Sequence, residues 1–333
     1  MDLLIFVASL LVILSGAFLF TNAVEWLGKK LNLTEGAVGS ILAAVGTAMP
    51  ETVIPVISVV FGVQGIGHEI GTGAILGAPF MLGTLAFFVV GLSAFLFRGH
   101  REKEYTFLDT DTEVLNRDLT FFIIVYTVAI WAAFLPAGWK FVVPLFLIGA
   151  YIVFVYKTLT EGKKSGQDHP PDPLFFARKN PDPTLSQILS QLIIAFLAIL
   201  IGAKIFVDEI TGLAFAWGIA PFIFSLLIAP VATELPEKLN SVIWIRQKKD
   251  TFALSNITGA MVFQSSLIPA LGIFITPWEL TPIALLSAFL AILSALIVLI
   301  FIRVRGYLDS RLLLVMGGIF YTFFVGIIVT GVL

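Results

Sequence analysis

Residues 43–51 read AAVGTAMPE and place a proline and a glutamate inside a run of apolar residues. The residues on either side, SILAAV and TVIPVISVV, have the composition of a membrane-spanning helix. A charged side chain at the centre of a bilayer costs about 2.5–3.5 kcal/mol on insertion scales, so such residues usually face the protein interior or an aqueous cavity. Glu51 is therefore a candidate functional residue.

The whole chain has the composition of a protein that crosses a membrane many times. Its 333 residues are 58% hydrophobic and 13% charged, with a mean hydropathy of +1.01. Apolar runs of roughly 17–25 residues indicate membrane spans. The sequence predicts an all-α integral membrane protein with ten transmembrane helices, at about residues 3–20, 36–61, 70–97, 119–135, 140–157, 185–207, 213–243, 252–275, 280–302 and 312–332.

Lysine and arginine are distributed unequally between the two sides of the predicted membrane. With ten spans both termini lie on one side, where the loops contain only Lys140 and Lys204, while the opposite loops contain 17 of the 20 basic residues. Because cytoplasmic loops carry the excess of basic residues, we expect a multi-pass protein of the cell (plasma) membrane with both termini outside and the large loops in the cytoplasm. The charge-rich segment 98–118 is interpreted as solvated cytoplasmic surface.

Several kinds of site are excluded by composition. The chain has no cysteine, which excludes disulfides, thiolate metal sites and cysteine nucleophiles. Its three histidines argue against a histidine-rich metal site. An intramembrane hydrolase would need a Ser/His pair, two catalytic aspartates or an H-E-x-x-H motif, and the predicted spans contain none of these. We expect no enzyme and no resident cofactor; inorganic cations and membrane lipid are the expected partners, nucleic acid is not, and protein partners stay open.

The longest polar stretch divides the chain into two halves. Residues 158–184 are rich in proline and charge, as linkers are, and separate residues 1–157 from residues 185–333. Each half has five predicted spans, and because five is odd, the second half enters the membrane in the opposite orientation. We therefore expect two inverted five-helix repeats joined by a cytoplasmic linker.

The two halves are related in sequence by an offset of 186 residues. This offset aligns 16–51 with 202–237 without a gap, and nine of the 36 aligned residues are identical. Five of the nine fall where AAVGTAMPE meets APVATELPE, residues 229–237. Acids at matching intramembrane positions of two repeats indicate a substrate site, so Glu51 and Glu237 are the primary candidates.

The prolines of these motifs also expose backbone oxygen. Proline has no N–H, so Pro50 leaves the carbonyl of Gly46 without its helical partner, and Pro236 does the same for Ala232. The two long predicted spans that contain these prolines, 36–61 and 213–243, have the pattern of broken or tilted helices. Freed carbonyls at membrane depth are tolerated where they line a cavity.

An all-oxygen site is predicted on one face of each motif. Helical spacing places two sets of residues on common faces: Ala44, Thr47 and Glu51, and Pro230, Thr233, Glu234 and Glu237. Carboxylates, hydroxyls and carbonyls without His or Cys suit a hard cation. Ca²⁺, which takes about 6–8 oxygen ligands, fits best, and Mg²⁺ and Mn²⁺ stay open. Because nearby acids repel one another, at least one would hold a proton when no cation is bound.

With these two motifs, the sequence resembles the calcium/cation antiporter superfamily, most closely its sodium/calcium exchanger branch. That family has ten core helices in two inverted halves, each with a G-[TS]-S-x-P-E motif followed by a G-S-N-x-F-[ND] helix. The corresponding segments here are GTAMPE (46–51), ATELPE (232–237), GAPFML (77–82) and GAMVFQ (259–264). The resemblance implies cation ligands at Glu51, Glu237, Thr47, Thr233 and the backbone near Ala44 and Pro230.

The chain also departs from the family pattern. Ala48 and Glu234 stand where the family usually has serine. Serine and Asn or Asp are replaced elsewhere by Ala78, Leu82, Ala260 and Gln264. We expect Glu234 and Gln264 to complete the ligand set, with three carboxylates balancing one divalent ion and fewer ligands for separate sodium ions.

These features together predict a cation antiporter. It would exchange Ca²⁺ for Na⁺ or H⁺ by alternating access at a midplane carboxylate site. A proton-coupled exchanger, or one for Mg²⁺ or Mn²⁺, is the alternative within transport, and a cation channel is the alternative from a different class.

Overall fold

The computed structural model describes residues 3–30, 48–62, 65–100, 106–161 and 171–330. The described chain forms two compact units, and each is considered by itself. The first lies within residues 1–74 and 152–236, and the second within residues 75–151 and 237–333. Each unit thus takes residues from both predicted halves.

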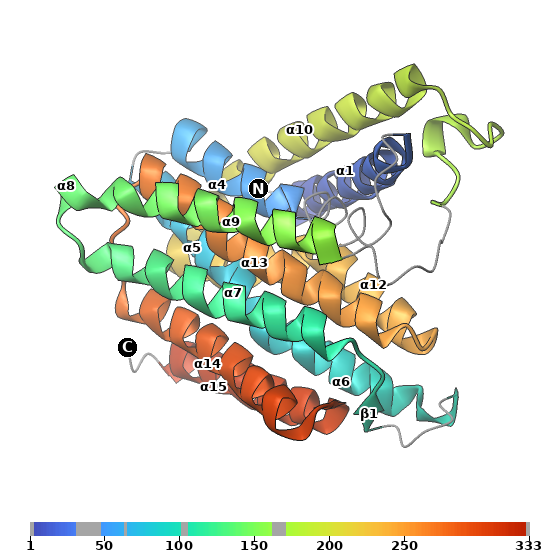
Figure 1. Ribbon diagram of the computed structural model, residues 1–333. Helices are drawn as coiled ribbons and strands as arrows, with labels where there is room; N and C mark the ends of the chain where they lie inside the picture. The colour runs from blue at the N-terminus through green and yellow to red at the C-terminus, as the bar shows by residue number, and fades with distance from the viewer. Residues whose placement is uncertain (1–2, 31–47, 63–64, 101–105, 162–170, 331–333) are drawn as a thin grey trace. The chain divides into compact units, whose positions relative to one another are not determined.

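The first unit is built around a pair of long helices. Its elements are α1 (Leu3–Lys30), α4 (Met49–Phe61), the first part of α5 (Ile66–Met81), the end of α9 (Val142–Glu161), a 3₁₀ turn η6 (Phe175–Ala177), α10 (Leu185–Trp217) and α11 (Pro221–Thr233). α1 and α10 lie side by side (Figure 1) and enclose an apolar core with α4 and α11. α10 begins at a capping box formed by Thr184 and Gln187 and is capped at its C-terminus by Gly218, whose φ of 66° lies in the left-handed region that favours glycine.

The contact between α1 and α10 is reciprocal. A Cβ atom on Gly16 would lie 2.8 Å from Cγ1 of Ile199, and one on Gly202 would lie 2.9 Å from Cγ1 of Ile13. Both pairs of equivalent residues differ by 186 positions, the offset that aligns the P-E motifs. The same residues thus meet from both sides, as in a contact with two-fold symmetry. This observation supports a repeat relation between α1 and α10.

We expect Gly16→Ala and Gly202→Ala each to lower the free energy of unfolding by about 1–3 kcal/mol, as overpacked positions do. Each new methyl group would also meet a backbone oxygen of the partner helix, at 3.1 Å for Gly16 and 3.2 Å for Gly202. Gly212→Ala is the control, because no atom lies within 4 Å of its Cβ position in the same helix α10. Denaturant unfolding in detergent measures all three, and equal stabilities would contradict the close packing.

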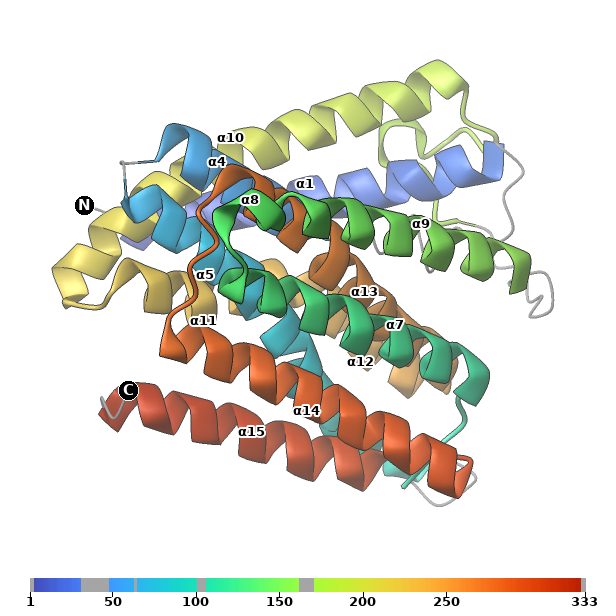
Figure 2. The ribbon, with the colours of Figure 1, turned by 60° about the vertical axis from the view of Figure 1, so that its left-hand side comes forward.

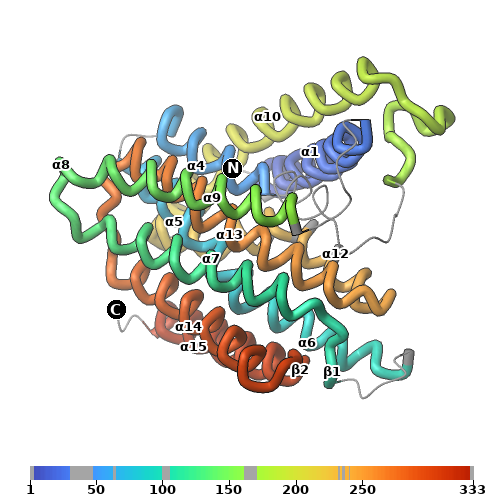
Figure 3. The backbone as a smooth tube through the Cα atoms, in the orientation of Figure 1, coloured from blue at the N-terminus to red at the C-terminus, as the bar shows by residue number. Residues whose placement is uncertain are grey.

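The second unit contains the remaining helices and a small sheet. Its elements are the end of α5, a π-helical turn η2 (Leu82–Ala86), α6 (Phe87–Leu96), η3 (Arg98–His100), β1 (Phe107–Leu108), α7 (Thr112–Trp131), η4 (Ala132–Phe134), α8 (Ala137–Lys140), the start of α9, most of α12 (Leu235–Arg246), α13 (Asp250–Ile275), α14 (Pro282–Arg305), β2 (Leu308–Asp309) and α15 (Ser310–Thr330). α7 packs on α13 and α14 (Figure 2), and α15 packs on α6. β1 and β2 pair antiparallel (Figure 3).

The described helices confirm an all-α membrane protein. Eight of them are long and apolar enough to cross a membrane, and they correspond to eight of the ten predicted spans. Of the predicted span 36–61, residues up to 47 lie outside the described ranges, and the rest forms α4. The predicted span 213–243 falls on the end of α10, on α11 and on α12. The full count of ten and the inverted repeats stay predictions.

Candidate cation site

Both P-E motifs lie in the first turn of a helix. α4 begins at Met49 and α12 at Leu235, in each case one residue before the proline. A proline there costs no helical hydrogen bond, because the first N–H groups of a helix have no acceptor within it. The break at Glu234 between α11 and α12 agrees with the prediction of a broken helix over 213–243, while residues 36–47 of the other predicted span lie outside the described residues. Gly46 lies outside the described residues.

The two acids are buried where the helix field favours negative charge. Glu51 is 3% exposed and Glu237 is 0% exposed. A carboxylate near a helix N-terminus is stabilised by about 0.3–1 kcal/mol, and by up to about 2 kcal/mol when partly buried. This offsets only part of the cost of burying a charge. Both positions therefore suit an acid that is compensated by a cation, a proton or hydrogen-bond donors.

Glu234 lies in the break between α11 and α12 and is fully buried. Its backbone N–H donates to the carbonyl oxygen of Pro230 at 3.1 Å. Thr233, the last residue of α11, is 2% exposed and donates its hydroxyl to the carbonyl oxygen of Ala229 at 3.0 Å. The Thr233 hydroxyl keeps a lone pair that a cation can use.

Two amide side chains of α13 are buried with unused hydrogen-bonding capacity. Gln264 is 0% exposed, and neither its amide nitrogen nor its oxygen has a hydrogen-bond partner within the described part of the chain. The side-chain nitrogen of Asn256, which is 4% exposed, lacks one there as well. A buried polar group left without a partner costs about 1–3 kcal/mol. This supports a ligand role for Gln264.

The predicted ligands divide between the two units. Glu51, Pro230, Thr233 and Glu234 belong to the first, and Glu237 and Gln264 belong to the second. Thr47 and Ala44 lie outside the described residues. Within the described ranges, no group of three or more His, Asp or Glu side chains that could hold a metal ion is found. The ligand set as a whole therefore stays a prediction.

Asp118 is a buried acid that the sequence interpretation wrongly placed on a solvated surface. α7 begins at Thr112, so Asp118 lies inside this helix and is 0% exposed. One carboxylate oxygen accepts hydrogen bonds from Nε and Nη2 of Arg117 at 3.0 and 2.9 Å. The other accepts from the hydroxyl of Thr258 in α13 at 2.8 Å. Asp118 thus joins α7 to α13.

The helix that corresponds to the predicted span 70–97 departs from regular α-helical geometry at the end of the motif GAPFML (77–82), between α5 and α6. Ala78 is 1% exposed, and the fully buried Leu82 opens the π-helical turn η2. The carbonyl oxygen of Gly83 accepts a hydrogen bond from the hydroxyl of Ser294 in α14. π turns are frequent at functional sites. No feature of the sequence interpretation predicted this turn.

Comparison with known proteins relates the whole chain to one family. A family model described as sodium/calcium exchanger protein matches residues 1–160 and 188–332. Inner membrane protein YrbG of Escherichia coli (strain K12) is 23% identical over 282 residues, which cover 84% of this chain and 81% of that protein. Uncharacterized membrane protein MJ0091 of Methanocaldococcus jannaschii is 23% identical over 261 residues, covering 77% of this chain and 76% of that protein.

Two solved structures share the fold. The structure of the H⁺/Ca²⁺ exchanger CAX matches with a TM-score of 0.77 at 16% identity, over 96% of this chain and 80% of that one. A structure of the sodium-calcium exchanger NCX_Mj, soaked with Na⁺ and Sr²⁺, matches with a TM-score of 0.62 at 19% identity, over 97% of each chain. At these identities the likeness shows the fold.

Proposed function

We propose that this chain, which belongs to the sodium/calcium exchanger protein family, is an antiporter that moves Ca²⁺ in one direction and Na⁺ or H⁺ in the other. Proteins of this family are transporters, and no covalent chemistry is part of the cycle. We place the antiporter in the plasma membrane with both termini outside, on the distribution of basic residues.

The observation that carries the proposal is the matched placement of Glu51 and Glu237. Both are buried, both follow a proline, and both lie in the first turn of a helix. Glu234 and Thr233 add oxygens next to the second motif, and Thr47 is expected to do the same for the first. This donor set is hard and all-oxygen, which suits Ca²⁺ better than the smaller and more demanding Mg²⁺.

Exchange follows from competition for one set of carboxylates. A site that holds either Ca²⁺ or its counter-ion, and opens to one side of the membrane at a time, couples the two flows because both cannot occupy it together. In the proposed site, Glu51, Glu234 and Glu237 would not all stay ionised without a cation, because like charges repel one another. Proton binding to the empty site is thus a built-in route to coupling.

The loss of oxygen ligands relative to the family pattern makes an H⁺-coupled exchanger the second candidate. The residues that replace family ligands include Ala78 and Ala260, which have no side-chain oxygen, and both are buried in helices. Fewer oxygen ligands leave fewer places for separate Na⁺ ions, whereas a proton needs only a carboxylate. Of the two similar structures, one is of an H⁺/Ca²⁺ exchanger and one of a sodium-calcium exchanger.

Radiolabelled Ca²⁺ uptake into proteoliposomes tests the proposal. We expect an imposed Na⁺ gradient or an imposed pH gradient to drive Ca²⁺ to a higher concentration inside than outside. Whichever gradient is effective identifies the counter-ion. Flux that only follows the Ca²⁺ gradient would indicate a channel, and uptake of Mg²⁺ or Mn²⁺ without Ca²⁺ would reassign the substrate.

A further inference from the structure

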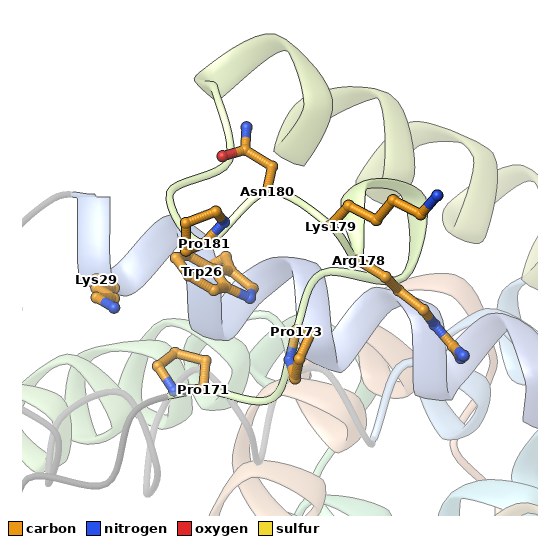
Figure 4. Close-up of a pocket in the computed structure, with 8 residues that line it drawn as sticks. All are labelled: Trp26, Lys29, Pro171, Pro173, Arg178, Lys179, Asn180 and Pro181. Atoms are coloured by element: carbon orange, nitrogen blue, oxygen red, sulfur yellow. The ribbon is translucent and has the colours of Figure 1, made fainter.

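A pocket of about 270 Å³ lies at the C-terminal end of α1, where residues of the linker segment 171–184 pack against that helix. Its lining residues are shown in Figure 4: Trp26, Lys29, Pro171, Pro173, Arg178, Lys179, Asn180 and Pro181. The charged residues among them are all cations. Lys29 lies on one side of Trp26, and Arg178 and Lys179 lie on the other (Figure 4).

The walls of the pocket are held in place by hydrogen bonds and apolar packing within the first unit. The indole N–H of Trp26 donates to the carbonyl oxygen of Asp172 at 2.8 Å, and the side-chain nitrogen of Asn22 donates to the same oxygen at 3.1 Å. The backbone N–H of Phe175 donates to the side-chain oxygen of Asn22 at 3.3 Å. Leu174 is 0% exposed and packs with Trp26 in an apolar cluster. These contacts fix the linker segment on α1.

None of the eight lining residues is an acid, but Asp172 lies between Pro171 and Pro173, and Asp182 follows Pro181 and is attracted by both Lys30 and Lys29. Lys30 donates a hydrogen bond to Asp182 at 2.6 Å, which holds the pKa of Asp182 below its usual value and keeps this carboxylate charged. Lys30 is thereby neutralised. The ammonium of Lys29 lies 4.6 Å from the centre of the Trp26 ring, and the guanidinium of Arg178 lies 4.8 Å from that of Phe175. The pocket therefore offers positive charge beside aromatic surface.

The pocket lies at the end of a candidate membrane span. α1 is long and apolar enough to cross a membrane, and Trp26 and Lys29 belong to its last turns. Two neighbouring aromatic residues, Phe175 and Phe176, are 41% and 45% exposed. Aromatic residues beside Lys and Arg at the end of a span are typical of the membrane interface. Clusters of basic residues in this position recognise the headgroups of anionic lipids.

We infer that this pocket binds the phosphate headgroup of an anionic phospholipid, with Lys29, Arg178 and Lys179 as its cationic partners. The Trp26 ring and the prolines pack against the apolar part of the lipid below the phosphate. The site is independent of the proposed ion exchange, because none of its residues belongs to the predicted cation ligands.

Thermal unfolding of the full-length protein in neutral detergent tests the inference. We expect phosphatidylglycerol to raise the unfolding midpoint, and phosphatidylcholine or inorganic phosphate to leave it unchanged. Arg178→Gln combined with Lys179→Gln, and separately Lys29→Gln, should each reduce this rise at least twofold. Each variant is compared with and without lipid, so a lower starting stability does not affect the result. Arg178→Lys, which keeps a positive charge at this position, should show the same rise as the unchanged protein.

Arg98→Gln is the matched control. Arg98 is an exposed residue whose guanidinium lies 4.7 Å from the centre of the Phe95 ring, which closely resembles the geometry of Arg178 over Phe175, but it does not line the pocket. It should keep the full rise. An equal rise in the pocket variants and in Arg98→Gln would overturn the inference. A rise with phosphatidylcholine equal to that with phosphatidylglycerol would also overturn it. An equal rise with inorganic phosphate would overturn it as well, and would identify a soluble anion as the ligand.

Discussion

Replacing either Glu51 or Glu237 by glutamine is expected to reduce divalent-cation uptake to the background of empty vesicles. Glutamine keeps the size and one carbonyl oxygen of glutamate but removes the negative charge, and a dehydrated divalent ion in a buried site depends on that charge. The neutral amide loses at most about 2 kcal/mol of stabilisation by the helix N-terminus but no longer buries a charge, so both variants should stay folded. Uptake in proteoliposomes and the thermal unfolding midpoint of the same preparations measure the two effects.

Glu69→Gln provides the control for this pair. Glu69 also lies in the first turn of a helix, α5, but its side chain is exposed. The same substitution should therefore leave uptake unchanged. Retained transport in Glu51→Gln or in Glu237→Gln would refute the assignment of that residue to the site, and would leave the location of the site open.

The second large effect concerns stability. Asp118→Ala is expected to lower the free energy of unfolding by about 3–5 kcal/mol, the usual cost of removing one partner from a buried ion pair. The side chain of Arg117 is only 10% exposed, and the Thr258 hydroxyl is buried too, so both would lose their carboxylate acceptor away from water. Denaturant unfolding in detergent measures this loss.

Asp208→Ala serves as the comparison for Asp118→Ala. Asp208 pairs with Lys204 at 2.5 Å within α10, but the two side chains are 53% and 42% exposed. Exposed pairs four residues apart on a helix contribute about 0.3–0.5 kcal/mol. A loss at Asp118 no larger than that at Asp208 would show that the Asp118 carboxylate does not stabilise the packing of α7 on α13.

The membrane class and most of the helices could be predicted from hydropathy alone, because long apolar segments have few alternatives in lipid. Membership in the family could be predicted from the paired P-E motifs, because acids at matching positions of two membrane spans indicate a substrate site. The membrane crossing and the family were both confirmed. Burial of Glu51 and Glu237 also agrees with the prediction, while their role as ligands awaits the transport measurement.

The placement of Asp118 on a solvated surface was wrong because hydropathy does not show where a helix with polar first turns begins. The first turns of α7 are polar, so the predicted span began at residue 119 and Asp118 was assigned to the loop before it. The cap at Asp111, which accepts hydrogen bonds from the backbone of Glu113 and Val114, was a local signal of the true start. The partner Thr258 is 140 residues away, and only the folded chain brings it to Asp118.

The prolines predicted broken helices, but not the residue at which each new helix begins. Proline in an apolar run predicts either a break inside a helix or the start of a new one, and composition does not distinguish them. At Pro50 and Pro236 the structure shows a start.

The reciprocal contact between α1 and α10 has the form of a contact between two copies of one chain. In such a dimer a single glycine codon would supply both Gly16 and Gly202, and a single isoleucine codon both Ile13 and Ile199. Gene duplication and fusion would keep that contact and release the two copies to change separately. Ala48 and Glu234 occupy equivalent positions in the two motifs but differ. In a homodimer both positions would be the same residue, so such a difference requires two copies joined in one chain.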